Sequence, residues 1–488
     1  MVRPPGPGAL PFPVPGELDG LLGRVARFLD ARGITAYLVG GFVRDGLLGR
    51  ETRDVDLAVA APAIPLAREL ADALPGHFVP LDQQHQVARV VVSPGLWHLD
   101  MATLAGDIDQ DMARRDFTVN AMAVPLGQPE GRVVDPWGGR QDLERHLIRA
   151  VSPSVFHEDP ARLLRGVRLA GQLGFQIEEA TAALIQRDAP LLSGVAGERL
   201  REEFMQLLSL LRAAPGVRTL DRLGLLSPLL PEMDPARGVA QPKEHHWDVF
   251  QHSVETVAAA DFLMGEGDGF PTWAREAFPW PPEAAAGMAE EVAGFPRRAL
   301  FKLACLLHDV AKPQTKAVQP DGRTRFLGHA PQGADIVRSA LARLRFSRRE
   351  SEMVAAMIVH HLRPTQMAHE ELPTRRAIYR FFRDTGEVAE EVLYLSLADH
   401  LASRGPELVP EAWQYHTRVV HYVMAERRHQ EAVPPLRLLT GHDIMAAFGL
   451  EPGPRVGQLL EKVAEARATG EVSTQEQALA LVRKELGT

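Results

Sequence analysis

A Gly-Gly pair followed by two aspartates on one short strand is the feature that most constrains this chain. The stretch LVGGFVRDGLLGRETRDVDLAV spans residues 38–59. Side chains of an extended strand alternate between its faces, so Asp54 and Asp56 point the same way, about 6.6 Å apart. A divalent cation such as magnesium binds a few carboxylates together with substrate phosphates. Gly40 and Gly41 precede a predicted short helix, where bare backbone N–H groups can approach a phosphate. The stretch therefore predicts phosphoryl or nucleotidyl transfer; a plain turn with two solvent-facing aspartates is the alternative.

Apolar spacing divides the chain into a mixed part and a longer helical part. Strand and helix patterns alternate over residues 34–125, and from about residue 141, including QDLERHLIRAV at 141–151, the spacing is helical. The Gly-, Pro- and Ala-rich stretch 265–287 is predicted to be a loop or insertion inside a later domain. We therefore predict the α+β class, with a small mixed-sheet head followed by all-α parts.

Composition limits the compartment and the partners. The single cysteine, Cys305, excludes a disulfide framework and is typical of a reducing cytoplasm, so a cytoplasmic location is predicted. No apolar run approaches the length of a membrane span, and no membrane partner is expected. The Pro/Gly-rich residues 1–16 lack the layout of a signal peptide and are predicted to be a disordered lead-in. A net charge of −9 argues against indiscriminate polyanion binding, although a local basic face can still bind RNA.

Two further stretches place arginines beside polar groups suited to a nucleotide. ARRDFTVNAMA at 113–123 combines possible triphosphate-binding arginines with possible ribose partners, namely Arg114, Arg115, Asp116 and Asn120. EDPARLLRGVRLAGQLGF at 158–175 repeats arginine every third residue, which gives a helix a roughly shared basic face. The alternatives are an exposed basic turn in the first stretch and, in the second, an Asp159 that only caps a helix beginning at Pro160.

The order of these stretches resembles the class II tRNA nucleotidyltransferase and poly(A) polymerase family. The matching pieces are GGFVRDGLLGR…RDVDL, RRDFTVNAMA, DPWGGRQDL and EDPARLLRGVR, with a weaker fifth, GERLREEF, and they cover roughly residues 34–225. The resemblance implies a polymerase-beta-like nucleotidyltransferase head over 17–150 and a helical neck and RNA-binding region over 151–235. It also implies Mg²⁺ as cofactor, the tRNA 3′ end and acceptor arm as partner, and CTP as substrate, with ATP left open.

The same resemblance assigns roles to individual residues. Asp54 and Asp56 would be the catalytic metal ligands, and Asp100, on the strand LWHLDMA, is a weaker candidate for a third carboxylate. The implied nucleotide-binding residues are Gly40, Gly41, Arg44, Arg115, Asp116, Asn120, Asp159, Arg162, Arg165 and Arg168. Asp159 and Arg162 would pair with the base edge of CTP or ATP, since a carboxylate accepts from an exocyclic amine and arginine donates to ring acceptors.

The connector between the Asp100 strand and RRDF departs from the pattern of enzymes that complete the CCA end. In those members it is longer, usually contains an arginine and acts as a flexible loop needed to switch to ATP. Here it is MATLAGDIDQDMA, residues 101–113, without Lys or Arg. This resembles the CC-adding subgroup, which leaves the final A to a separate enzyme. A compact loop that still permits A addition is the alternative; poly(A) polymerase is disfavoured because no basic stretch follows Asp56.

Histidines and aspartates recur on successive helical segments of the C-terminal half, and His308-Asp309 heads the run HDVAKP. Imidazole suits transition metals, and an adjacent carboxylate can bridge two ions. The pattern resembles the HD phosphohydrolase superfamily and implies an HD metal-dependent phosphohydrolase domain over 236–430, before a helical tail over 431–488. The implied metal ligands are His252, His308, Asp309 and Asp399, with His329, His360 and His361 for a second position and His245 and His246 less certain. A purely structural HD domain is the alternative.

Together these features predict a template-independent tRNA nucleotidyltransferase that adds two cytidines, with an additional HD phosphohydrolase activity dependent on a divalent transition metal of unknown identity. Full CCA addition from CTP and ATP is the first alternative. An HD phosphohydrolase whose head only holds RNA is the second, and a non-catalytic RNA-binding module is the third. Hydrolysis of phosphomonoesters or 2′,3′-cyclic phosphates by a metal-activated water is the reaction implied for the HD site.

Overall fold

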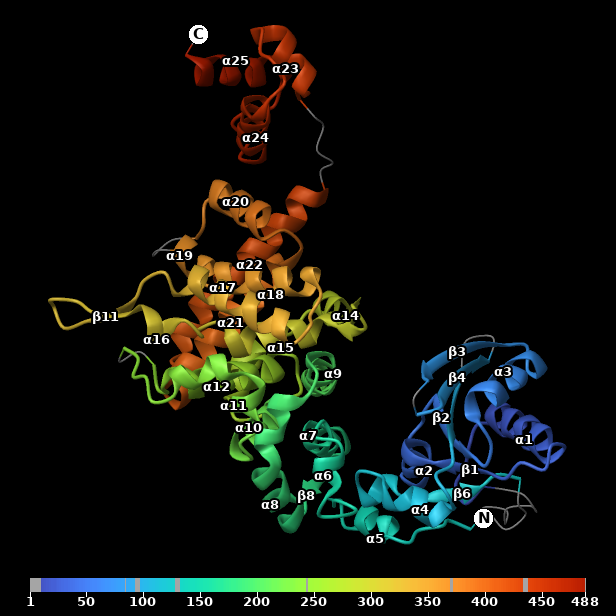
Figure 1. The fold of residues 1–488 in the computed structure, drawn as a ribbon. Coiled ribbons are helices and arrows are strands. Elements are labelled where there is room, and N and C mark those ends of the chain that lie inside the picture. The colour runs from blue at the N-terminus through green and yellow to red at the C-terminus, as the bar shows by residue number, and fades with distance from the viewer. Residues whose placement is uncertain are drawn as a thin grey trace. The chain divides into compact units, whose positions relative to one another are not determined.

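A computed structural model describes residues 10–83, 85–92, 97–127, 132–242, 245–368, 372–432 and 438–487. The chain forms two compact units: residues 1–195 with 222–228, and residues 196–221 with 229–488. The first contains the mixed sheet and the second is almost entirely helical (Figure 1). This matches the predicted α+β class. Within the described residues, no helix is long and apolar enough to cross a membrane.

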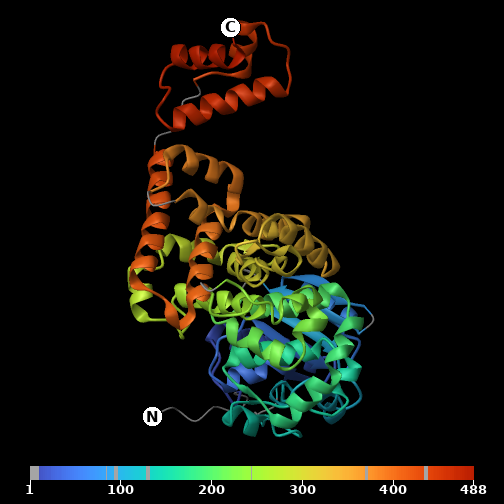
Figure 2. The same cartoon turned by 90° about the vertical axis from the view of Figure 1, so that its left-hand side faces the viewer.

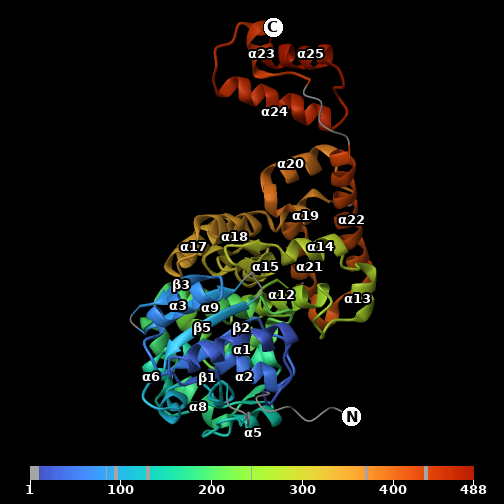
Figure 3. The same ribbon diagram turned by 90° about the vertical axis from the view of Figure 1, so that its right-hand side faces the viewer.

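The first unit is built on a six-stranded sheet in the order β3-β4-β5-β2-β1-β6. Its strands are β1 (Ala36–Val39), β2 (Asp54–Val59), β3 (Gly76–Asp82), β4 (Val87–Val92), β5 (Trp97–Thr103) and β6 (Ala123–Pro125). β2 and β5 run parallel and the other neighbouring pairs are antiparallel. Figure 3 shows β2 and β5 in the body of the sheet, which carries the predicted carboxylates.

Helices cover and extend this sheet. They are α1 (Gly16–Asp30), α2 (Gly40–Leu47), α3 (Ala63–Ala73), α4 (Ile108–Ala113), α5 (Gly139–Glu144), α6 (Val155–Glu158), α7 (Arg162–Leu173) and α8 (Glu179–Asp188), with 3-10 turns η1 (Thr118–Asn120) and η2 (Ala189–Gly194). α3 packs across β3, β4 and β5. Val55, Leu57 and Val59 of β2 are all buried, so this face of the strand anchors it in the core.

Two local predictions in this unit need correction. The stretch 141–151 was expected to be helical, but α5 ends at Glu144 and β7 (Leu147–Ile148) pairs in parallel with β8 (Gln176–Ile177). α7 begins at Arg162, after a turn through Asp159 and Pro160, rather than at Pro160. Of the predicted lead-in, residues 1–9 lie outside the described residues, whereas Phe12 is buried against Phe42.

The second unit is a helical assembly. Its early elements are α9 (Gly197–Leu208), α10 (Ala214–Arg222), α11 (Leu226–Leu229), η3 (Pro231–Ala236), α12 (Val249–Leu263), α13 (Thr272–Ala277), α14 (Pro282–Ala289), β9 (Glu291–Val292), β10 (Phe295–Pro296), α15 (Arg297–Leu307) and α16 (Lys312–Thr315); α10 and α11 each cross a unit boundary. The stretch 265–287, predicted to be a loop or insertion, contains α13 and the beginning of α14, so the loop alternative is wrong.

The later elements complete this unit. They are β11 (Lys316–Val318), β12 (Thr324–Phe326), α17 (His329–Arg343), α18 (Arg348–His360), α19 (Arg363–Met367), α20 (Arg375–Thr385), η4 (Gly386–Val388), α21 (Ala389–Arg404), η5 (Gly405–Glu407) and α22 (Pro410–Ala432). α12, α15 and α21 pack against one another, and α18 packs against α15, α17 and α21.

Three helices close the chain: α23 (Gly441–Phe448), α24 (Pro454–Ala468) and α25 (Gln475–Leu486). They share a hydrophobic core of their own, including Ile444, Leu459 and Val482. Every side chain of that core, and every partly buried apolar side chain packed on it, comes from residues 438–486. We call residues 438–487 the C-terminal bundle; Figure 2 shows it in red.

Candidate functional sites

The paired strands β2 and β5 place three carboxylates at one point of the sheet. Asp56 is the register partner of Asp100, and Asp54 lies two residues before Asp56 on the same face. The Asp54 side chain is 60% exposed, whereas Asp56 is half-buried. Burial, with a contribution from the charges of Asp100 and Asp54, raises the pKa of Asp56 to about 6 although Arg115 opposes the shift. A carboxylate cluster that resists full ionisation is a suitable place for a divalent cation.

The start of α2 is in contact with this cluster, and Gly40 makes the contact feasible. Gly40 has a φ of +65°, and a Cβ there would lie 2.9 Å from Nη1 of Arg115 and 3.1 Å from Oδ2 of Asp56. At Gly41 a Cβ would lie 3.5 Å from Nη2 of Arg44. The Gly-Gly pair thus lets an arginine and a carboxylate approach the backbone at a helix start. The predicted approach of a phosphate to these backbone N–H groups stays a prediction.

Arg44 and Asn120 are joined across the first unit. Arg44 is buried and donates from Nη1 to Oδ1 of Asn120 at 2.7 Å. Asn120 in turn donates to Oδ1 of Asp116 at 3.0 Å, and Arg165 donates to Oδ2 of Asp116 at 3.3 Å. Burial by itself would raise the pKa of Asp116, but Arg165, Asn120 and the Phe117 N–H together lower it. Four predicted nucleotide-binding side chains therefore form one hydrogen-bonded network with a firmly ionised aspartate at its centre.

Asp159 and Arg162 also lie together, at the turn before α7. Asp159 accepts from the Ala161 N–H at 3.2 Å, and its Oδ2 lies 3.8 Å from Nε of Arg162. Arg162 donates to the Arg114 carbonyl at 2.9 Å, which links this turn to the RRDF segment. Arg168, one turn beyond Arg165, donates to Gln172 of the same helix. Asp159 therefore stabilises the turn before α7 and does not cap that helix, whose N-cap is Ala161 without a side-chain hydrogen bond.

Three residues near this site were not predicted. Arg89 of β4 donates to both oxygens of Asp100, and His98 lies 3.0 Å from Oδ1 of Asp54. Asp111, only 3% exposed, accepts from Arg114 and Arg115. Arg89 is the only charged residue of the otherwise apolar strand β4, and this pattern could have predicted a functional role for it. Asp111 lay inside the connector, where only the absence of positive charge was considered.

The connector itself is short and structured. β5 continues to Thr103, four residues follow, and α4 then begins after Asp107, whose side chain caps the helix by accepting from the Gln110 N–H. Oδ1 of Asp111 accepts from the Ala105 N–H at 3.3 Å, so α4 is bonded back to the loop that precedes it.

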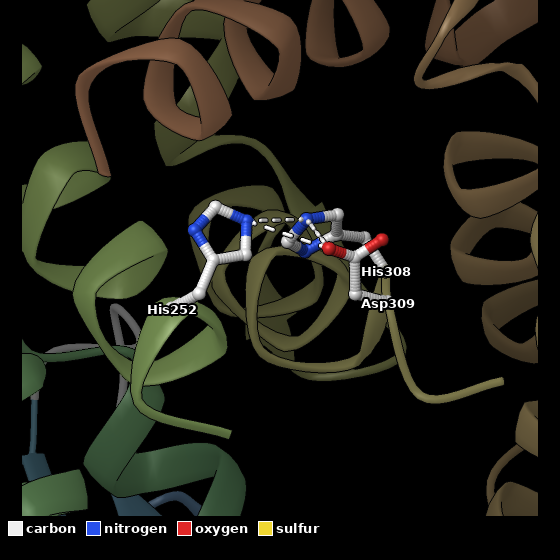
Figure 4. Close-up of side chains that lie close together, drawn as sticks. All are labelled: His252, His308 and Asp309. Carbon is white, nitrogen blue, oxygen red and sulfur yellow. Dashed lines mark hydrogen bonds and ion pairs between the residues drawn. The ribbon is translucent and has the colours of Figure 1, made fainter. Parts of the chain in front are cut away.

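The second site gathers side chains from five helical segments of the second unit. His252 comes from α12, His308 and Asp309 follow α15, His329 begins α17, His361 follows α18, and Asp399 lies on α21. Figure 4 shows His252, His308 and Asp309 turned toward one another. The site is closed on most sides, since the side chains of His252, His308, Asp309 and His361 are at most 1% exposed, whereas Asp399 is 22% exposed.

Asp309 stands between two groups of ligands. Its Oδ2 lies 3.4 Å from Nε2 of His252 and 3.2 Å from Nε2 of His308. Its Oδ1 lies 3.4 Å from Nε2 of His329 and 3.9 Å from Nε2 of His361. Asp399 closes the first group, with Oδ1 3.1 Å from Nε2 of His252.

The protonation pattern of the histidines suits metal binding. Three of them place Nδ1 against the backbone carbonyl three residues earlier: His308 on Cys305, His329 on Phe326 and His361 on Ile358. An Nδ1–H held by a carbonyl leaves Nε2 as a lone pair aimed at the centre. Burial lowers the pKa of His361 to about 4, and burial also lowers the pKa of His252 and His329, so these rings are neutral near pH 7.

Asp309 supplies the matching anionic ligand. Burial would raise its pKa, yet His308 and Lys312 hold it well below the usual range. Both of its buried oxygens accept no hydrogen bond within the described residues, although Lys312 lies 2.6 Å from Oδ2 as an ion pair. Against the effect of burial, the nearby charges of Asp309 and Asp399 raise the pKa of His308, so this ring differs from the other three. A buried carboxylate that faces several imidazole nitrogens fits one or two divalent cations.

In each of the two adjacent histidine pairs, only one ring lies at or beside the candidate metal site. His360 interacts with Arg363 and Asp384, and the structure does not bring it into the cluster. A helix turns by about 100° per residue, so only one of two adjacent histidines faces the centre, and that one is His361. His245 packs edge-on against His252 with ring centroids 5.5 Å apart, beside the ligands, while His246 is exposed.

Models of known protein families match four parts of the chain. "Poly A polymerase head domain" matches residues 36–107 and 96–149, and "Probable RNA and SrmB-binding site of polymerase A" matches 174–237. "HD domain" matches 283–404, and "tRNA nucleotidyltransferase domain 2 putative" matches 434–482. The HD match begins after His252, which the structure nevertheless places beside His308 and Asp309 in the candidate metal site.

Curated relatives align over nearly the whole chain. An A-adding tRNA nucleotidyltransferase of Deinococcus radiodurans is 37% identical, covering 92% of this chain and 95% of the relative. A CC-adding tRNA nucleotidyltransferase of Thermus thermophilus is 36% identical over 92% and 93%. One of Geobacter sulfurreducens, also CC-adding, is 32% identical over 97% of both chains.

Solved structures share the fold. The Thermotoga maritima CCA-adding enzyme in complex with tRNA superimposes with a TM-score of 0.62 at 22% identity, covering 97% of this chain and 96% of that one. A CCA-adding enzyme in complex with CTP gives a TM-score of 0.65 at 22% identity, covering 97% of both chains.

Proposed function

The chain belongs to the tRNA nucleotidyltransferase family, and on that premise we propose that its head adds two cytidines from CTP to the immature 3′ end of tRNA and leaves the terminal A to another enzyme. The observation that carries the cytidine restriction is the connector after β5. It is a four-residue loop and one short helix, capped by Asp107 and tied through the buried Asp111 to Arg114 and Arg115. A segment held in this way has little freedom to rearrange when the incoming base changes.

Different residues of the head are suited to bind the triphosphate, the base and the metal. Arg115, beside Gly40 and Asp56, is suited to bind the triphosphate, and the Asp159–Arg162 pair is suited to read the base edge of CTP. Mg²⁺ held by Asp54 and Asp56 would activate the primer 3′-OH and neutralise the leaving pyrophosphate. The Asp116 network orients Asn120 and Arg165 around the nucleotide.

Incorporation onto two tRNA transcripts tests this function. One transcript ends before CCA and the other after CC, and each receives CTP, ATP or both. Extension of the first by two cytidines, with no A added to the second, is the expected result. Because one relative is named A-adding and others CC-adding, addition of A to the second transcript alone would replace the proposal by A addition, and completion of CCA would replace it by full CCA synthesis.

We also propose a phosphohydrolase activity for the HD site, carried by the position of Asp309 between His252/His308 and His329/His361. A carboxylate placed in this way can bridge two ions, and a metal-activated water is the nucleophile such a site provides. Asp399 is the most exposed of the ligands, so substrate would reach the centre from its side.

Separate variants distinguish the two activities. Asp54→Ala is expected to abolish nucleotide incorporation while hydrolysis of a 2′,3′-cyclic nucleotide in Mn²⁺ persists. Asp309→Asn is expected to do the reverse, and Asp335→Asn, an exposed aspartate of α17, serves as its matched control. Incorporation that survives Asp54→Ala would favour a head that only holds RNA. Hydrolysis that is unaffected by Asp309→Asn would leave the HD fold with a structural role.

A further inference from the structure

A row of arginines on α20 faces the C-terminal bundle. Arg376, Arg380 and Arg383 follow one another at helical spacing and span about 10 Å along the axis. We call these three residues the arginine row. The opposite face of the helix is buried in the HD region through Ile378 and Phe381.

Acidic side chains of the bundle cover the row. Glu465 of α24 lies 3.0 Å from Arg376 and 2.7 Å from Arg380. Glu471, just after α24, lies 2.6 Å from Arg376, and Glu461 pairs with Arg383. Each arginine of the row is therefore neutralised by a carboxylate of the bundle.

This interface is polar. The apolar core of the bundle is closed within residues 438–486. A cavity of 520 Å³ lies between α20 and α24, lined mostly by charged side chains that include Arg455 and Lys462. The arginines of the row keep 37–51% of their side chains exposed within the contact. Glu461 and Glu471 are exposed as well, whereas the Glu465 side chain is 12% exposed. Exposed ion pairs contribute little and are screened by salt, so the pairs of Glu461 and Glu471 are weak and Glu465 is the main partner of the row.

We propose that the arginine row is a binding face for the RNA backbone, which the C-terminal bundle covers in the free protein and which RNA phosphates expose by displacing Glu461, Glu465 and Glu471. Guanidinium groups bind phosphate as they bind carboxylate, in a two-point geometry, so one row serves both partners. RNA carries many phosphates whose counterions are released on binding, and this gives it an advantage over three glutamates. The inference goes beyond the proposed function, because it requires neither cytidine specificity nor hydrolysis.

Binding of tRNA to the full chain, without nucleotide, tests the covering contact. Glu461→Gln/Glu465→Gln removes a partner from every arginine of the row and is expected to tighten tRNA binding about fivefold at low salt. Glu451→Gln/Glu476→Gln makes the same charge change at exposed positions of the bundle and is expected to leave the affinity within about twofold. Equal affinities of the two double variants would overturn the proposal.

The arginines are tested in the same assay. Arg376→Gln/Arg380→Gln is expected to weaken tRNA binding and to lower the slope of log affinity against log salt by about 2, one for each lost phosphate contact. An unchanged slope contradicts an RNA-binding face. Poly-glutamate that competes with tRNA equally well would instead assign the row to an acidic protein partner.

Displacement of the bundle has its own readout. Cys305 is the only cysteine and is buried, so spin labels can be placed at Val409→Cys and Ser473→Cys, both exposed positions. One narrow distance distribution is expected in the free protein, and a broadened or longer one with tRNA bound. A distribution that tRNA leaves unchanged would show that the bundle does not move and would refute the displacement.

Discussion

Arg89 holds Asp100 by two parallel bonds, from Nε to Oδ1 at 2.7 Å and from Nη2 to Oδ2 at 2.8 Å. Asp100 is at the same time the register partner of Asp56 across β5 and β2. A guanidinium that binds both oxygens neutralises the charge of Asp100 beside the predicted metal ligands. Asp100 therefore differs from Asp54 and Asp56 in its ion pairing, and the sequence had predicted it only as a weaker candidate for a third carboxylate.

This difference predicts unequal effects of mutation. Asp100→Asn is expected to lower the single-turnover rate of cytidine incorporation by about 10- to 100-fold, as loss of a supporting carboxylate does. Asp56→Asn is expected to lower it by about 1,000-fold or more, because it removes a direct metal ligand. If Asp100→Asn were as inactive as Asp56→Asn at saturating Mg²⁺, Asp100 would be a direct ligand and Arg89 would have to move during catalysis.

Ionisation of Asp56, which metal binding requires, lowers the stability of the folded state. Its pKa is raised to about 6, mainly by burial, so the folded state binds this proton more tightly than the unfolded state does. The free energy of unfolding therefore falls as pH rises from about 4 to 6, and it stays lower above that range. In EDTA at pH 7.5, Asp56→Asn is expected to raise the free energy of unfolding by about 1–3 kcal/mol in urea titrations.

The gain from Asp56→Asn should disappear near pH 4, where the native carboxyl is already protonated. Asp54→Asn is the control, since its side chain is 60% exposed, and a much smaller change is expected. A gain of the same size at pH 4 and pH 7.5 would show that packing, and not the charge of Asp56, is responsible.

The HD cluster makes a prediction that does not depend on its substrate. Asp309 is fully buried among the four histidines, and its charge is balanced on one side by Lys312, so a bound divalent cation should stabilise the folded state by mass action. Mn²⁺ added to chelator-treated protein is expected to raise the melting temperature by several degrees. Asp309→Asn should abolish this shift, whereas the exposed Asp335→Asn should retain it. An equal shift in both variants would place the bound ion elsewhere.

Alternation along one strand was enough to predict that Asp54 and Asp56 share a face, and a His-Asp dipeptide was enough to locate the centre of the HD cluster. Both features are local, so neither depends on how distant segments meet. The contact between Asp100 and Arg89, by contrast, joins two different strands and is not a local feature. Arg89 reaches Asp100 only because β4 pairs with β5 in one register, and that register is a property of the assembled sheet.

The same limit explains the other differences. The segment at Leu147–Ile148 was expected to be helical, but it becomes a strand because Gln176–Ile177 is available to pair with it. His360 and His361 carry equal weight in the sequence, and only the packing of α18 on α15 and α21 decides which ring faces Asp309. The contact between the arginines of α20 and the glutamates of the C-terminal bundle could not be predicted either, because the two sets of residues lie about 80 residues apart in the chain.

His416 predicts how the second unit responds to acid. Its ring is buried, lies face to face with His400 at 4.9 Å between centroids, and has Nε2 3.1 Å from the Ser396 carbonyl. Burial lowers the pKa of His416 to about 4, against 6.5 for the ordinary group. Between pH 6.5 and 4 this histidine is protonated in the unfolded chain and neutral in the folded chain. The free energy of unfolding therefore falls as pH drops from about 6.5 to 4. The loss amounts to about 3 kcal/mol for this ring.

Replacing the ring should remove its share of that slope. His416→Gln is expected to flatten the dependence of unfolding free energy on pH between 6.5 and 4, measured by urea titration in EDTA, while His442→Gln, at an exposed position of the C-terminal bundle, should leave it unchanged. His400, whose pKa burial lowers to about 3, contributes in the same direction and sets the slope that remains in His416→Gln. If His416→Gln were as sensitive to acid as the parent chain, His416 would already be protonated in the folded state. Its positive charge would then be balanced by Asp399, the carboxylate that raises its pKa.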